Sequence, residues 1–237
     1  MRSASLETSE SVASTMASVC ALRWRAIFIA RTTSGCGRPA ERPITSVLAS
    51  MRPRRESASC DGEAAIAADH VNVEDTARRV SRSEVEGAIE AIAGAERVLI
   101  AGTDQMAFFA SYLRHLLMLL DLQADIVASP SQEALSRLGR IDDSMLVIGL
   151  SAGRPHPLVV RAMKLARHRK AGTVAITDAT LSEVAKLAQI RLYYSSNSPA
   201  YVRSHTALLS MIQALAYGVY SRDAEQYADR IKAFRLK

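Results

Sequence analysis

Aromatic residues and cysteine are scarce in this sequence. Phe, Tyr and Trp make up 5% of its 237 residues although 49% are hydrophobic, so Ala, Leu, Val and Ile must fill the core. The only cysteines, Cys20, Cys36 and Cys60, lie in the first quarter, unevenly spaced and without nearby histidines. This pattern matches neither a zinc site nor a disulfide framework, so we expect no metal and a reducing, cytoplasmic setting.

Long apolar runs and nucleotide-binding motifs are also missing. No stretch of about 18 uninterrupted apolar residues occurs, so we expect no membrane span. Neither a Gly-x-Gly-x-x-Gly nor a Walker loop is present, which disfavours a dinucleotide or a nucleoside triphosphate, and we expect no cofactor. The net charge of +6 and the pI near 9.5 permit nucleic acid or anionic ligands as partners, but establish neither a fold nor a function.

The first 61 residues differ from the rest of the chain. Ser, Ala, Arg and Thr dominate, lysine is absent, and no apolar period persists beyond residues 19–30. We predict a mostly disordered segment, with a targeting peptide or a shifted reading frame as alternatives. The predicted division is an irregular segment over 1–70, in place of a DNA-binding domain, and a globular domain over 71–237 with its core at about 82–221.

Helical and strand patterns alternate from residue 82 onward. Short apolar runs predict strands at 97–101, 124–128, 145–150, 173–177 and 190–194. Apolar residues at helical spacing predict helices at 82–95, 106–120, 132–138, 156–171, 181–188 and 202–220. The alternating order predicts a three-layer α/β/α sandwich with a five-stranded parallel sheet and right-handed crossovers.

Small and polar residues follow the predicted strands, at the edge where parallel sheets bind ligands. Hydroxyl and amide groups at this edge suit a phosphorylated or polyhydroxylated ligand. The candidate ligand-binding residues are Gly102, Thr103, Asp104, Gln105, Ser151, Ala152, Gly153, Arg154 and Ser204.

Three of the polar residues near these loops allow two interpretations each. Arg154 either holds a phosphate through its guanidinium or is solvated. His156 is either an acid or base or, as we favour, a residue that shapes the start of the following helix. Asp178 either binds a sugar hydroxyl or, as we favour, caps the next helix. We predict no catalytic residue.

The stretch from Val174 to Ala188 resembles one family. Val174-Ala175-Ile176-Thr177-Asp178, Leu181-Ser182 and Ala185-Lys186-Leu187-Ala188 are very close to the run AITDsplSplAklAD of sugar isomerase (SIS) domains in RpiR-type bacterial transcriptional regulators. Residues 97–102, 142–150 and 204–215 support the resemblance, which covers about 72–221. It implies a flavodoxin-like sandwich, usually dimeric, whose strand-end loops bind a phosphorylated sugar that controls DNA binding by an N-terminal helix-turn-helix domain.

The chain departs from this family in two places. The family's central loop, Ser-x-Ser-Gly-x-Thr-x-Glu, has its positions at Gly149, Ser151, Ala152, Arg154 and His156, so only the hydroxyl of Ser151 survives. Either Arg154 replaces the lost Thr as the anion holder, or the ligand is not a typical sugar phosphate. Residues 1–61 also show no pair of amphipathic helices joined by a short turn.

The sequence therefore leads to one main hypothesis and two alternatives. The main hypothesis is a non-catalytic, sugar-phosphate-sensing homodimer, with DNA as a partner only if the N-terminal segment or a partner chain supplies a reader. The first alternative is an aldose-ketose phosphate isomerase, with His156 or His205 as the base and Arg154 as the phosphate clamp. The second is a dimer with only an interaction role. For dimerisation, the apolar face of residues 208–216 is either an interface or ordinary core.

Overall fold

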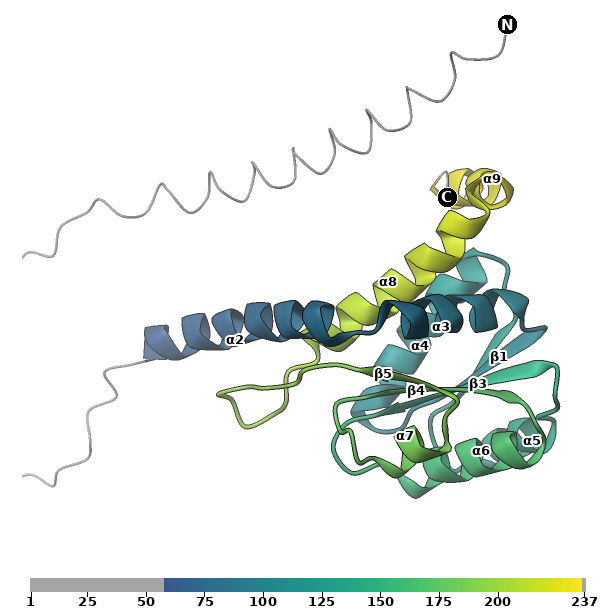
Figure 1. Ribbon diagram of the computed structural model, residues 1–237, viewed down its shortest axis with the longest axis horizontal. Coiled ribbons are helices and arrows are strands. Elements are labelled where there is room, and N and C mark those ends of the chain that lie inside the picture. The colour runs from purple at the N-terminus through teal and green to yellow at the C-terminus, as the bar shows by residue number, and fades with distance from the viewer. Residues whose placement is uncertain (1–57, 236–237) are drawn as a thin grey trace, which may run out of the picture. The chain divides into compact units, whose positions relative to one another are not determined.

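Five short apolar strands form one parallel sheet in the order β2-β1-β3-β4-β5 (Figure 1). The structure, a computed structural model, describes residues 58–235. The strands are β1 (Arg97–Ala101), β2 (Ala124–Val127), β3 (Met145–Ser151), β4 (Gly172–Thr177) and β5 (Ile190–Tyr193). In the register Ile100 pairs with Ile126 on one side and with Ile148 on the other. The prediction of a five-stranded parallel sheet is confirmed.

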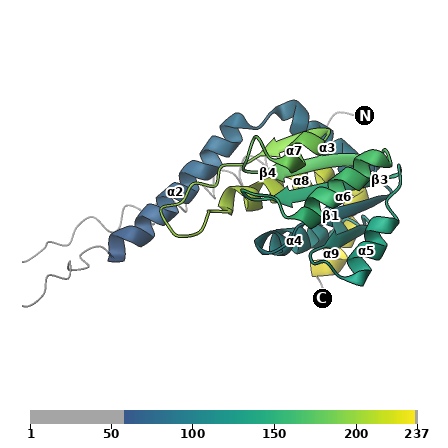
Figure 2. The same cartoon turned by 90° about the horizontal axis from the view of Figure 1, so that it is seen from below.

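Helices cover both faces of the sheet, which explains why the central strands are apolar throughout. The helices on one face are α3 (Arg82–Gly94), α4 (Gln105–Leu119) and α8 (Thr206–Arg222), and those on the other are α5 (Gln132–Gly139), α6 (Pro157–His168) and α7 (Glu183–Leu187). Alternate side chains point to opposite layers, so Ile148 packs in the core under α4 and α8 while Val147 packs under α6. Figure 2 shows α6 and α7 lying across the sheet.

Close packing on the α6 face depends on Gly149 in β3. A Cβ atom there would lie 2.8 Å from a Val184 methyl and 3.0 Å from the Met163 sulfur. Both helices therefore approach the strand more closely than any other residue would permit. The face of residues 208–216 is mostly ordinary core, because Leu208, Met211, Ile212, Leu215 and Ala216 are buried on the sheet.

Two helices were not predicted. α2 (Ala58–Arg79) occupies residues 58–70, which we had assigned to the irregular segment, and α9 (Ala224–Arg235) follows α8. The contact face of α2 is largely polar: Asp69, Asn72 and Thr76 hydrogen-bond to the rest of the domain, and Val73 packs against the core. A helix held by polar groups lacks the apolar period on which the prediction relied, so that part of the prediction is wrong.

The interpretations of residues 1–57 as a disordered segment, a targeting peptide or a shifted frame lie outside the described residues. Over residues 58–235 no helix has both the length and the apolar character that crossing a membrane requires.

Candidate functional site

A cavity opens where β1 and β3 end, between the loop that enters α4 and the loop that enters α6. The chain leaves β1 toward one face of the sheet and β3 toward the other, so the two loops diverge and leave a crevice at the carboxyl ends of the strands. The cavity has a volume of about 190 Å³. Among the predicted site residues, its lining includes Thr103, Asp104, Gln105, Ser151, Ala152 and Arg154.

Two predicted glycines shape these loops from outside the lining. A Cβ atom on Gly102 would lie 2.8 Å from the carbonyl oxygen of Met106, so only glycine allows α4 to start this close to β1. Gly153 has a φ of +60°, in the left-handed region. Its amide donates a hydrogen bond of 2.7 Å to Oδ1 of Asp178.

Asp178 ties the central loop to the segment that follows β5. Its side chain is 1% exposed. While Oδ1 accepts from Gly153, Oδ2 accepts hydrogen bonds from Oγ of Ser196 at 2.8 Å and from Nη1 of Arg203 at 3.0 Å. The interpretation of Asp178 as a helix cap is wrong, because Ser182 occupies the N-cap position of α7. Sequence reasoning missed Arg203, because its role is indicated only by its contact with Asp178, 25 residues earlier in the chain.

The Ser151 hydroxyl is already engaged. Its Oγ donates to Oγ1 of Thr177 at 3.0 Å, and both side chains are buried. Ser151 can therefore accept a further hydrogen bond but can donate one to a ligand only if this bond breaks. Behind it, burial raises the pKa of Tyr194, the negative charge of Asp178 raises it further and Arg203 opposes the shift, so the phenol stays protonated.

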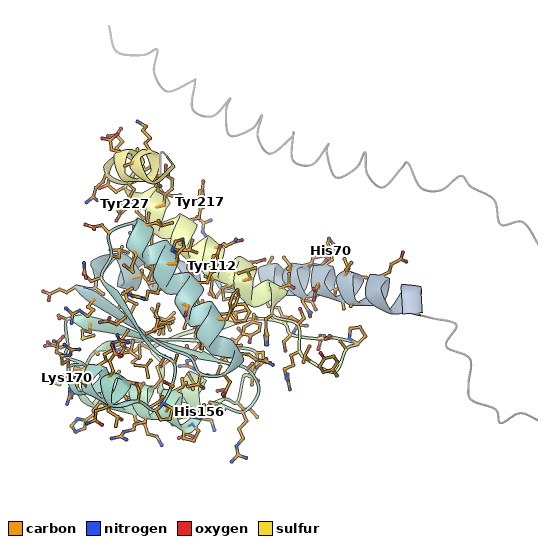
Figure 3. All side chains as sticks on the ribbon, turned by 180° about the vertical axis from the view of Figure 1, so that it is seen from behind. His70, Tyr112, His156, Lys170, Tyr217 and Tyr227 are labelled. Atoms are coloured by element: carbon orange, nitrogen blue, oxygen red, sulfur yellow. The ribbon has the colours of Figure 1, made fainter. Side chains whose placement is uncertain are left out.

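The start of α6, where His156 lies (Figure 3), offers no free amide. Nδ1 of His156 accepts from the amide of Leu158 at 3.1 Å, and Pro157 has no N–H. The amides of Val159 and Val160 both bond to the carbonyl of His156. The interpretation of His156 as a residue that shapes the helix start is confirmed, and an anion at this loop must rely on other donors.

Arg154 supplies such a donor. Its side chain is exposed at the rim of the cavity, and within residues 58–235 it forms no hydrogen bond or ion pair. A free guanidinium can take a phosphate or carboxylate in a two-pronged hydrogen bond.

His205 lies beside the β1 loop, half-buried at the start of α8. Its Nε2 lies 3.0 Å from Oε1 of Gln105, so Nε2 carries the proton, and Nδ1 is buried without a partner among the described residues. Burial lowers the pKa of His205, Asp178 opposes the shift and Arg203 adds to it. The imidazole is therefore neutral at pH 7, with its lone pair on Nδ1.

A model of the SIS domain family matches residues 91–217, more than half of the chain. The chain belongs to the SIS domain family. The resemblance seen in residues 174–188 is thus confirmed. The comparison with curated proteins finds no match.

Solved structures share the fold of this SIS domain. The sugar isomerase domain of an RpiR transcription factor from Sphaerobacter thermophilus is 23% identical, with a TM-score of 0.69 over 73% of this chain and 97% of that one. Vibrio vulnificus NanR complexed with ManNAc-6P is 18% identical, with a TM-score of 0.67 over 74% and 67%. A Methanococcus jannaschii protein, inferred to be a 3-hexulose-6-phosphate isomerase, is 15% identical, with a TM-score of 0.55 over 70% and 94%.

The remaining predicted site residue, Ser204, lies outside the cavity, and the described residues of this SIS domain form no metal site. Ser204 is not in the lining of the cavity, and its hydroxyl donates instead to Asp69 of α2. Across the described part of the chain, no three His, Cys, Asp or Glu side chains gather as a metal site would require.

Proposed function

We propose that this SIS domain binds a phosphorylated sugar or a related carbohydrate derivative at the ends of β1 and β3, as the sensing module of an RpiR-type regulator. The observation that carries the proposal is the free guanidinium of Arg154 at the rim of a cavity lined by Thr103, Gln105 and Ser151. A guanidinium suits the phosphate, and the hydroxyl and amide groups suit the sugar. The names of the similar structures, an RpiR transcription factor and NanR with ManNAc-6P, agree with this ligand class and role.

Regulation requires that the ligand contact two arrangements of the protein differently. The loop between β5 and α8 supplies a route, since it bonds to Asp178 at the site and to Asn72 of α2. DNA is a partner only if the N-terminal segment or a partner chain supplies a reader. We also propose a homodimer, supported by the exposed apolar side chains Phe108, Met118 and Tyr217 on α4 and α8.

A thermal-shift screen of the full chain tests the ligand. Phosphosugars and their unphosphorylated forms are compared at equal concentrations. A ligand present at about a hundred times its Kd stabilises the protein by roughly 2.7 kcal/mol, which raises the Tm by roughly 5–10 °C for a domain of this size. Arg154→Gln is expected to abolish the shift, whereas Arg140→Gln, an exposed arginine after α5, leaves it intact. Equal shifts with the unphosphorylated sugars, or no shift at all, would contradict the proposal.

An isomerase is the second candidate, because the imidazole of His205 is neutral beside Gln105; to act as a base, His205 must move its lone pair from the buried Nδ1 to Nε2. Enolisation needs a base that removes a proton next to the sugar carbonyl. In D₂O such a base exchanges that proton for deuterium, which NMR detects even without net turnover. A sensor without catalysis leaves the proton in place. Exchange that disappears in His205→Gln would instead establish the isomerase.

A further inference from the structure

The cavity at the ends of β1 and β3 is small. Its volume of about 190 Å³ lies below the roughly 300–1,000 Å³ typical of small-molecule sites. A second cavity, of about 720 Å³, adjoins it and shares Asp104, Arg154, Pro155 and His156 in its lining. A ligand whose phosphate lies at Arg154, which lines both cavities, can therefore extend into the larger one.

The larger cavity runs along α6, and positive charge remains there after the ion pairs are formed. Nζ of Lys164 lies 2.7 Å from Oε1 of Glu183, so these two charges compensate each other. Arg161, one turn before Lys164, lines the cavity and has no hydrogen bond or ion pair within residues 58–235. Asp104 is the remaining acidic side chain of the lining. The lining thus holds two uncompensated guanidinium groups, of Arg154 and Arg161, and one uncompensated carboxylate, of Asp104.

The first amides of α6 are not available to an anion in this cavity, so the arginine side chains of the lining are its charged donors. Pro157 has no N–H, and the three amides after it bond to His156. Arginine carries its charge at every physiological pH, and its planar fork matches a carboxylate. Arg161 is therefore suited to a carboxylate at the end of a ligand whose phosphate lies at Arg154.

We propose that the larger cavity is a carboxylate subsite, and that the ligand class is an acidic sugar phosphate: a phosphorylated sugar acid with its phosphate at Arg154 and its carboxylate at Arg161. The subsite rests on the proposed function, since it assigns the far end of the same ligand. It goes further by excluding neutral phosphosugars as the preferred class.

Two linear probes that differ in one group test the subsite. 6-Phosphogluconate carries a carboxylate at C1, and glucitol 6-phosphate carries a hydroxymethyl group at the same carbon. Calorimetric titration of the full chain is expected to give a Kd at least tenfold lower for 6-phosphogluconate. Arg161→Gln is expected to remove this preference and to leave the affinity for glucitol 6-phosphate unchanged. Arg167→Gln is the matched control, since Arg167 is exposed on the same helix outside both cavity linings.

The outcomes separate the two proposals. Equal affinities of the two probes, or a preference that survives in Arg161→Gln, overturn the subsite and leave the sugar-phosphate function standing. A panel of phosphosugars without any binding overturns both. Arg161 is exposed, so the Tm of Arg161→Gln without ligand is expected to equal that of the wild type, which excludes misfolding as the cause of a lost preference.

Discussion

The carboxylate of Asp178 joins three segments that are far apart in the sequence. It accepts hydrogen bonds from the central loop at Gly153 and from Ser196 and Arg203 after β5. Hydrogen bonds to a charged group are stronger than neutral ones, and losing the charge leaves donors without a full acceptor. This one side chain therefore fixes the loop that carries the proposed ligand contacts.

Asp178→Asn is expected to lower the free energy of unfolding by about 2 kcal/mol, because the amide keeps one acceptor oxygen and turns a donor toward other donors. Urea denaturation measures the loss. Asp143→Asn provides the control, as Asp143 is exposed before β3. Equal denaturation midpoints for the two variants would show that Asp178 does not hold the loops together.

His205 makes the stability of the domain depend on pH. Its pKa in the folded protein is lowered from the ordinary value of 6.5, chiefly by burial, so the unfolded chain binds the proton more tightly. The contribution of His205 to the free energy of unfolding is therefore fully present above pH 6.5. It falls as the pH drops from 6.5 toward the pKa of the folded state. Unfolding free energies measured between pH 8 and pH 5 are expected to decline over this window.

His205→Gln is expected to flatten the decline, because the side chain no longer titrates. His168→Gln, at the exposed end of α6, serves as the control and is expected to keep the wild-type slope. An unchanged slope in His205→Gln would assign the pH dependence to another group.

Sequence reasoning predicted the cavity-lining residues that follow a strand directly. Thr103, Ser151 and Arg154 were predicted because the ends of parallel strands meet at one edge of a sheet. Arg203 and Asp69 were not, since their roles depend on partners far along the chain, Asp178 and Ser204. No local pattern encodes such a contact.

Helix α2 holds the β5–α8 loop in place through side-chain hydrogen bonds. Asn72 is fully buried, and its side chain bonds to the backbone N–H and C=O of Asn197 and to the hydroxyl of Ser195. Thr76, one turn later, accepts from the amide of Ser195 at 2.8 Å. Helix α2 thus contacts the loop at Ser195 and Asn197, and Ser196 between them bonds to Asp178.

Asn72→Leu is expected to lower the free energy of unfolding by about 2 kcal/mol, since three partners lose a buried amide. Hydrogen exchange is expected to become faster in the 195–204 loop and in α2 together, because each element holds the other. His70→Ala, on the exposed side of the same helix (Figure 3), is the control. Faster exchange confined to α2 would contradict the coupling.

At the scale of the whole molecule, the fold was predictable because strand and helix patterns alternate without a break from residue 97 to the start of α8. Apolar runs of β3 and β4 and the apolar face of α6 are local signals that survive in the structure. The chain before residue 82 carries no such signal. There α2 packs through the hydrogen bonds of Asp69, Asn72 and Thr76 and through Val73, which gives too few apolar positions for a helical period.

A chain that begins at Ser81 should therefore be much less stable than one that begins at Ala58. The cut removes the hydrogen bonds of Asp69, Asn72 and Thr76 to the loop and to the start of α8, and it opens the apolar groove of about 270 Å³ between α2, α3 and α8. At about 1 kcal/mol for each bond the loss is roughly 4–8 kcal/mol, a large part of the 5–15 kcal/mol by which domains are usually stable. Denaturation midpoints of the two chains measure this difference. Equal midpoints would mean that the sheet and its own helices fold without α2, and that α2 is an appendage rather than part of the domain.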